Sequence, residues 1–196
     1  MNIKGLSSKY VVKRLGDSDI QDILHLCCAN TIYYEYCPPM VTEESIKKDM
    51  IVLPPNTGID DKFYIGFYSE GKLIAVMDLI AGYPEQNIAY IGFFMTDVTI
   101  QKRGIGSEII SEVCDHLRQQ NFVSVRLAWV KGNLQAEHFW LKNGFAVLKE
   151  TTSNVADSVI LAERCLNQDI FVEPALLEGE ELERNTFSRK GRNSEK

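Results

Sequence analysis

Residues 88–120 read IAYIGFFMTDVTIQKRGIGSEIISEVCDHLRQQ, and this stretch decides the fold. Its first part, Tyr90 to Met95, is an apolar run with the composition of a strand. From Ile109 to Leu117 apolar residues recur at helical spacing opposite acidic and hydroxyl side chains, which predicts an amphipathic helix. A short glycine-bearing turn joins the two elements. The sequence therefore predicts a strand, a tight turn and a helix in succession.

The turn is predicted to bind an anion. It consists of Gln101, Lys102, Arg103, Gly104, Ile105 and Gly106. A turn fixed between a strand and a helix leaves the first helical N–H groups without intrahelical acceptors. Gly104 and Gly106 would let the backbone approach phosphate oxygens without a Cβ in the way, and Lys102 and Arg103 add positive charge to the helix dipole. We interpret the turn as a pyrophosphate cradle.

Other phosphate-binding loops are excluded by pattern. The chain has no Gly-x-x-x-x-Gly-Lys-Ser/Thr and no Gly-x-Gly-x-x-Gly, so a nucleoside triphosphatase loop and a dinucleotide fingerprint are both missing. What remains resembles the acyl-CoA loop of the GCN5-related N-acetyltransferases, the GNAT superfamily. In that family Gln/Arg-x-x-Gly-x-Gly/Ala joins the fourth strand to the third helix and wraps the pyrophosphate of coenzyme A.

A second motif agrees with this resemblance. Residues 133–145, NLQAEHFWLKNGF, are similar to the family's Asn-x-x-Ala-x-x-Leu/Phe-Tyr-x-x-x-Gly-Phe helix. The two motifs stand in the family's order with a strand-like segment, Ser124 to Val130, between them. The resemblance covers roughly Tyr10 to Cys165.

The resemblance implies an α/β (α+β) fold, a mixed and mostly antiparallel central sheet flanked by helices and splayed at the fourth strand. It predicts an acetyltransferase domain over residues 1–166 and a charged C-terminal extension over 167–196. It also predicts a bulge in the fourth strand near Phe94, Met95 and Thr96, which would free backbone groups to hold pantetheine.

The chemistry implied by the resemblance is direct transfer of an acetyl group from acetyl-CoA to an amine, either a small molecule or a protein amine. The cradle would hold the donor, together with main chain near Met95, Thr96 and Val98. The second motif contributes Asn133 and Trp140 to the same cofactor-binding set. A backbone N–H in the splayed strand would stabilise the oxyanion without reorganising during the reaction.

Proton transfer is where the chain departs from the family pattern. Many members have a glutamate early in the fourth strand and a tyrosine in the last helix, and here these places hold Tyr90 and Trp140. An indole N–H donates hydrogen bonds but is not a practical acid. Asp78 interrupts an apolar strand, where a carboxylate must be paired, solvated or used. The candidate replacements are Asp78 and a tyrosine, either Tyr90, Tyr83 or one of the cluster at 33, 34 and 36. We expect Asp78 to act as base or water-orienter with Tyr90 nearby; the alternative is that no single side chain is essential.

The segment Tyr33 to Pro39 is rich in tyrosine and then rigid, before a helix predicted from Thr42 to about Leu53. The resemblance makes this segment the lip of the acceptor site. The alternative is a tyrosine cluster that packs over the edge of the core. His116 and His138 have no neighbours that suggest a triad or a metal site, and we expect surface or core histidines.

Composition sets further bounds. With 196 residues, 45% of them hydrophobic, the chain suits one α/β domain with a full core. Its net charge of -6 argues against nucleic acid as a partner. The negative charge either attracts cationic amine substrates or is the ordinary excess of acidic residues in a cytoplasmic protein. Five cysteines without a Cys-x-x-Cys pair, and no His-Glu-x-x-His, predict reduced thiols and no metal site. No signal-like or membrane-spanning apolar run is present, so we expect a cytoplasmic protein without a membrane partner.

Two further expectations concern association. A non-catalytic acyl-CoA-binding sensor or interaction module is the alternative function, because the usual glutamate and tyrosine are replaced. The terminal extension and an exposed last strand leave room for a homodimer. The identity of the acceptor is not encoded in any motif of the lip.

Overall fold

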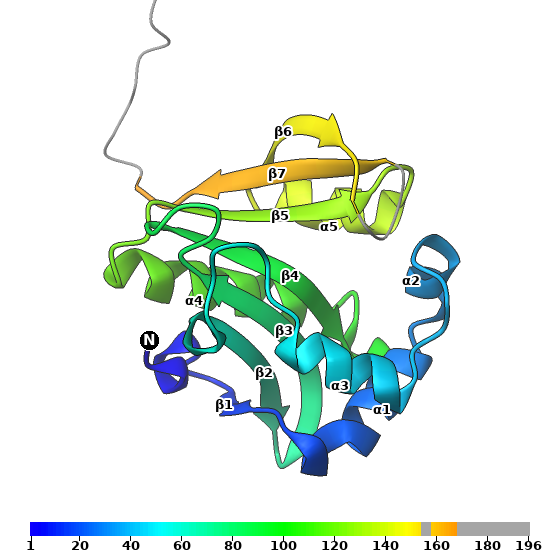
Figure 1. Ribbon diagram of the computed structural model, residues 1–196. Coiled ribbons are helices and arrows are strands. Elements are labelled where there is room, and N and C mark those ends of the chain that lie inside the picture. Colours follow the sequence, from blue (N-terminus) through cyan, green and yellow to red (C-terminus); the bar gives the residue numbers. More distant parts are fainter. Residues whose placement is uncertain (154–157, 168–196) are drawn as a thin grey trace, which may run out of the picture.

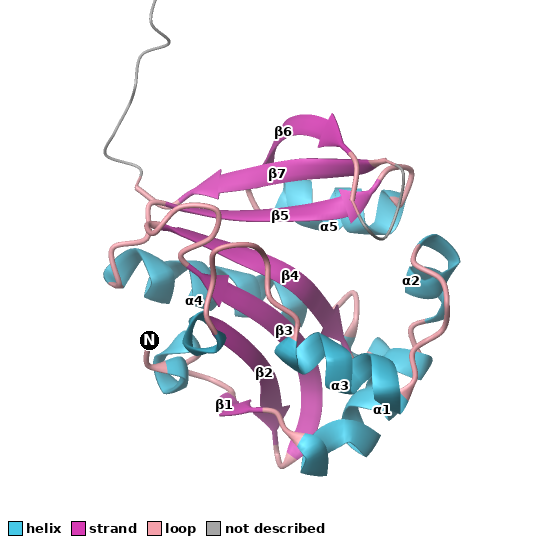
Figure 2. Cartoon of the chain, viewed as in Figure 1, coloured by secondary structure: helices cyan, strands magenta, loops and turns pink. Residues whose placement is uncertain are grey.

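The computed structural model describes residues 1–153 and 158–167 of the chain. Within these residues a seven-stranded sheet carries helices on both faces (Figures 1 and 2). The predicted C-terminal extension, 167–196, lies outside the described residues except for Asn167.

The strands are β1 (Val11–Arg14), β2 (Lys62–Ser69), β3 (Lys72–Ala81), β4 (Ile88–Thr96), β5 (Ser124–Val130), β6 (Ala146–Thr151) and β7 (Val159–Cys165). The helices are α1 (Ile20–Cys28), α2 (Thr31–Tyr36), α3 (Glu43–Ile51), α4 (Ile105–Gln119) and α5 (Leu134–Lys142). Short 3₁₀ turns precede several of these elements, among them Val98–Ile100 ahead of the cradle. No helix within the described ranges is long and apolar enough to cross a membrane.

The sheet has the strand order β1-β2-β3-β4-β5-β7-β6. Among these strands only β4 and β5 run parallel, and the other neighbours are antiparallel, which confirms the predicted mixed sheet. β4 pairs with β5 only from Ile88 to Ile91, whereas it stays paired with β3 as far as Thr96. We call residues 92–96 of β4, which have lost their β5 partner, the splay. The predicted opening of the fourth strand is therefore confirmed.

The bulge in β4 lies earlier than expected. Asp78 pairs with Phe93 but Leu79 pairs with Ile91, so the extra residue is Gly92 and not one of Phe94 to Thr96. A Cβ at Gly92 would lie 2.9 Å from Asp78 Oδ2. The bulge thus forms where the backbone has no side chain and a neighbouring carboxylate can lie against it.

Two cores flank the sheet. One lies between the sheet and helices α4 and α5, the other between the sheet and helices α1 and α3 (Figure 1). The first is built from the apolar stripe that the sequence predicted for α4, including Ile109, Val113 and Leu117. The second contains Ile23 of α1 and Ile46 of α3, packed with Tyr64 of β2. Each face of the sheet is therefore covered by a different pair of helices.

Most expected element ends are confirmed. Thr42 caps α3 through a hydrogen bond from the Ser45 N–H, and Asn133 caps α5 through one from the Ala136 N–H. The sequence Gly16-Asp17-Ser18 predicts that Asp17 or Ser18 caps the first helix; this prediction is wrong, because a 3₁₀ turn precedes α1 and Asp19 accepts the Gly16 N–H. The tyrosine-rich lip also contains a helix that was not predicted, α2, which has no buried residue.

Candidate functional site

The cradle has the backbone of an anion site. Gly104 adopts a left-handed conformation with φ of 84°, and α4 begins at the next residue. The first helical hydrogen bond joins the Glu108 N–H to the Gly104 carbonyl, so the N–H groups of residues 105–107 have no intrahelical acceptor. A Cβ at Gly104 would meet nothing within 4 Å. The space beside Gly104, at the start of α4, is therefore open.

The charges around the cradle favour an anion. Lys102 and Arg103 are exposed just before the helix. Glu108 in the first turn would oppose an anion, but Lys9 forms an ion pair with it and the Tyr10 hydroxyl donates to it at 2.8 Å. The hydrogen bond from Lys9 is the largest cause that holds the pKa of Glu108 below its ordinary value. The N-terminal segment thus neutralises the only acidic side chain in this first turn.

Gly106 also has a role in packing. A Cβ at this position would lie 3.2 Å from Cε2 of Phe139 and 3.5 Å from Cγ2 of Thr96. Its missing side chain therefore lets α4 pack closely against α5 and the end of β4. Of the two glycines, only Gly104 faces open space.

Gln101 ties the cradle to the connection between α1 and α2. Its Nε2 donates to Asn30 Oδ1 at 2.7 Å and to the Thr96 carbonyl at 3.2 Å. Asn30, between α1 and α2, donates to the same Thr96 carbonyl at 3.1 Å and to the Leu26 carbonyl at 2.9 Å. The side-chain amide of Gln101 is thus bonded within the protein, so Gln101 can bind a ligand only through its main chain.

We expect Gln101→Leu to lower the free energy of unfolding by about 1–2 kcal/mol, because Asn30 Oδ1 loses its donor without a change in side-chain size. Urea unfolding measures the loss. Gln119→Leu, at an exposed position near the end of α4, is the matched control and should change stability by less than about 0.5 kcal/mol. Equal effects of the two changes would contradict the role of the amide network.

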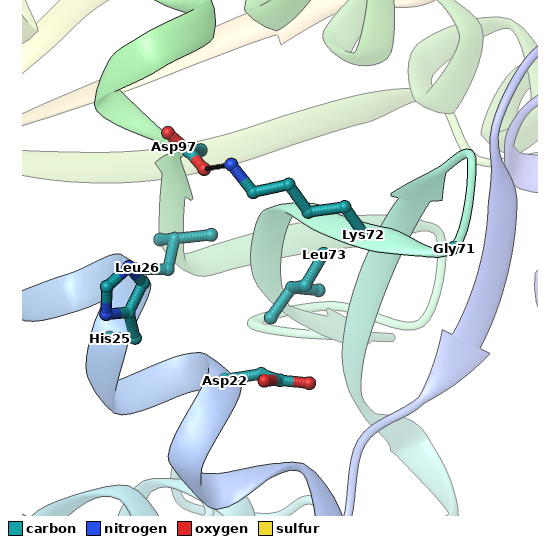
Figure 3. A pocket seen from close by; sticks show the side chains of 7 residues that line it. All are labelled: Asp22, His25, Leu26, Gly71, Lys72, Leu73 and Asp97. Atoms are coloured by element: carbon teal, nitrogen blue, oxygen red, sulfur yellow. Dashed lines mark ion pairs between the residues drawn. The ribbon is translucent and has the colours of Figure 1, made fainter.

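Asp97 fixes the turn that leads into the cradle. It accepts the Thr99 N–H at 2.8 Å and pairs with Lys72 at 2.6 Å. Burial acts to raise the pKa of Asp97, but the hydrogen bonds from Lys72 and Thr99 hold it below the ordinary value. A cavity of about 260 Å³ lies beside this pair, between α1 and the β2–β3 hairpin (Figure 3). Asp22 and His25 border it as well, but none of the predicted site residues does.

Asp78 is paired within the fold. Lys62 Nζ lies 2.7 Å from both carboxylate oxygens of Asp78, and the Lys62 side chain is 1% exposed. Burial is the largest cause that raises the pKa of Asp78; Lys62 opposes the rise and Asp49 adds to it. The carboxylate is therefore held rigidly at the bulge, with a cation as its counter-ion.

The lip contacts the strand at this same point. Tyr33 of α2 packs edge-on against Phe93, with ring centroids 5.6 Å apart, and against Tyr34 at 5.0 Å. Phe93 is the strand partner of Asp78. The aromatic lip, the bulge and the Asp78–Lys62 pair thus meet on the α1 and α3 face of the sheet. The lip therefore packs over the edge of the core, against Phe93, which is the strand neighbour of Asp78.

Tyr90 lies on the paired part of β4, opposite Ile80 of β3 and before the bulge. Its ring packs edge-on against Tyr83 with centroids 5.4 Å apart. Burial is the main cause that raises the pKa of Tyr90, so its hydroxyl stays protonated at neutral pH. Tyr90 is available as a hydrogen-bond donor and cannot serve there as a base.

The other predicted residues are spread over both sides of the splay. Asn133 is buried and uses its Oδ1 to cap α5, and Trp140 packs among Phe94, Phe139 and Phe145 in an aromatic cluster. On β4, Met95 is buried in the core under α1 and α3. Val98 is 40% exposed in the 3₁₀ turn after the strand.

Sequence reasoning missed Lys62, Gly92 and Asn30. A lysine at the start of an apolar strand was a usable signal, since burying it requires an acidic partner and Asp78 was the acid in the next strand. Gly92, inside the apolar run of β4, was a usable signal for a bulge. Nothing local marks Asn30, whose role depends on contacts with residues far along the chain.

Several solved structures share this fold at low sequence identity. An acetyltransferase from Thermus thermophilus has a TM-score of 0.68 at 15% identity, with 84% of this chain and 99% of that chain covered. The ribosomal-protein-S18-alanine N-acetyltransferase of Escherichia coli has a TM-score of 0.58 at 13% identity, with 83% of this chain and 99% of that chain covered. The PaiA N-acetyltransferase of Thermoplasma acidophilum, in complex with coenzyme A, has a TM-score of 0.59 at 15% identity, with 80% of this chain and 98% of that chain covered. No curated protein matches the sequence.

The family model for the acetyltransferase (GNAT) family matches residues 29–145. This range contains both motifs, the splay, the cradle and Asp78. It spans more than half of the chain, from the lip through the end of the α5 motif. The chain belongs to the acetyltransferase (GNAT) family.

Proposed function

We propose that the chain is an N-acetyltransferase that moves an acetyl group from acetyl-CoA directly to an amine of a small molecule or a protein. The observation that carries this proposal is the cradle after the splay, where Gly104 borders open space and the first N–H groups of α4 have no intrahelical acceptor. Family membership supports acetyl transfer in general. The similar solved structures include N-acetyltransferases, one of them in complex with coenzyme A.

The residues present fit such a donor. The N–H groups of residues 105–107, with the cations of Lys102 and Arg103, would hold its pyrophosphate. Residues 92–96 of β4, which have no β5 partner, offer main-chain groups to its pantetheine arm, apart from the Thr96 carbonyl, which already accepts from Asn30 and Gln101. Acetyl-CoA, when bound, supplies an activated acetyl thioester. The protein's own contribution is to fix that thioester beside the acceptor.

On the acceptor side, the fixed carboxylate of Asp78 is the group suited to receive an ammonium or to orient a water molecule. Its raised pKa moves it toward the range in which a carboxylate can take a proton. Lys62 holds it in one orientation, while Tyr33 and Phe93 form an aromatic wall beside it. Tyr90, on the same strand as Phe93, supplies a protonated hydroxyl that can donate a hydrogen bond in this proposal.

A non-catalytic acyl-CoA-binding sensor is the second candidate. The observation that favours it is the pairing of both Asp78 oxygens with Lys62, which leaves the expected base already occupied by a cation. Calorimetric titration with acetyl-CoA, coenzyme A and ATP tests the donor site shared by both candidates. Release of free coenzyme A thiol with a panel of amines then separates them, because a sensor supports no release above background hydrolysis.

We expect Asp78→Asn to lower turnover at least about tenfold and to change donor affinity less than twofold, because asparagine keeps an oxygen for Lys62 but cannot take a proton. Thiol-release rates and calorimetry measure the two quantities. Asp60→Asn, at an exposed position, is the control and should behave as wild type. Wild-type rates in Asp78→Asn would remove the carboxylate from the mechanism.

A further inference from the structure

Next to the splay, β5 carries a buried tryptophan, Trp129, whose indole N–H has no hydrogen-bond partner. β4 pairs with β5 only as far as Leu127, but β5 continues to Val130 and stays paired there with β7, Trp129 opposite Ile160. Trp129 therefore lies two residues past the last β4 contact, on the part of β5 that borders the splay. Its side chain is on the α4 and α5 face, in the core cluster that also contains Trp140.

Trp129 is 5% exposed, and its Nε1 is buried without any hydrogen-bond partner. Within residues 1–153 and 158–167, the only other buried side-chain atom in this state is Nε2 of His116. His116 lies in the last turn of α4, and its ring packs next to Gly5 of the N-terminal segment, not next to the splay. Buried indole N–H groups usually find an acceptor, since leaving one unpaired costs stability without any gain in packing.

We propose that the Trp129 indole N–H donates a hydrogen bond to an amide carbonyl of the pantetheine arm of the acyl donor. This inference rests on the proposed function. An indole N–H is a donor only, so its partner must be an acceptor. The phosphates of the donor are matched by the cations and N–H groups of the cradle, whereas the arm carries neutral amide carbonyls suited to a neutral donor. A bound arm would therefore satisfy an atom that the free protein leaves unpaired.

Trp129→Phe tests the proposal, because it keeps an aromatic ring and removes the N–H. The two probes are coenzyme A, which has the arm, and adenosine 3′,5′-bisphosphate, which has the nucleotide phosphates and no arm. We expect the calorimetric affinity for coenzyme A to fall about five- to tenfold and that for the bisphosphate to stay within twofold. The melting temperature of the free variant should change little, since the smaller ring and the removed unpaired N–H act in opposite directions.

The outcomes separate this proposal from the one on which it rests. If wild type binds neither probe, the donor-site assignment itself fails. If wild type binds coenzyme A and the variant binds it equally well, the indole contact is wrong. A loss of the same size for both probes would mean that Trp129 acts only through the packing of the domain, which also overturns the contact.

Discussion

Gly104→Glu should weaken acetyl-CoA binding at least about a hundredfold while the domain stays folded. Two physical effects add. The new carboxylate would project into the open space beside Gly104, at the N-terminus of α4, and repel a phosphate bound there. The residue would also have to keep a φ of 84°, which costs a non-glycine residue about 1–2 kcal/mol. Calorimetry gives the affinity, and circular dichroism with urea unfolding gives the state of the fold.

A matched control exists in the same chain. Gly71, in the β2–β3 turn, has a φ of 81°, and a Cβ there would also meet nothing within 4 Å. Gly71→Glu therefore carries the same backbone strain and the same added charge outside the cradle. We expect it to lose similar stability and to bind acetyl-CoA as wild type. Unchanged affinity in Gly104→Glu, or an equal loss in Gly71→Glu, would remove the cradle assignment.

Lys62→Met should lower the free energy of unfolding by about 3 kcal/mol at neutral pH, because it leaves the Asp78 carboxylate largely buried without its counter-ion. Methionine keeps most of the length of the lysine side chain, so the loss is mainly electrostatic. Lys131→Met is the control: its ion pair with Glu150 also measures 2.7 Å, but both side chains are about half exposed, at 58% and 49%. It should change stability by less than about 0.5 kcal/mol.

The loss of stability in Lys62→Met should increase with pH. The pKa of Asp78 is already raised by burial, and removing Lys62 takes away the contribution that lowers it. A carboxyl whose folded-state pKa lies above its unfolded value binds a proton more tightly in the folded protein, so its protonation stabilises the fold at low pH. That contribution disappears as the pH rises through the folded-state pKa. The deficit of Lys62→Met relative to wild type should therefore be larger at pH 8 than near pH 5, and a deficit independent of pH would contradict an unpaired Asp78.

Short-range pattern was enough to predict the β4–cradle–α4 unit. The apolar run of β4, the left-handed turn at Gly104 and the stripe of α4 each depend on residues within a few positions of one another, so local propensity and periodicity predict them. The same holds for the caps at Thr42 and Asn133.

Register was harder to predict, and the partner of Asp78 depended on it. Counting back from the tight turn pairs Ser69 with Lys72 and would put Phe63 opposite Asp78. An irregularity between Phe67 and Tyr68 shifts the register by one residue, so that Tyr64 is the partner of Asp78. A shift of one residue moves every β2 side chain between the irregularity and the start of the strand to the other face of the sheet. Only after this shift does Lys62 lie on the face of Asp78.

The sequence by itself determined the family, most of the strands and helices, and the position of the glycine-bearing turn before α4, because these follow from local spacing. Tertiary structure alone decided that Lys62 neutralises Asp78, that Gln101 binds Asn30, and that the Trp129 N–H is left without a partner. Each of these depends on which strands pair, where a bulge shifts the register and where pairing stops. Those outcomes are set by the packing of two helical layers on one sheet, which no short segment encodes.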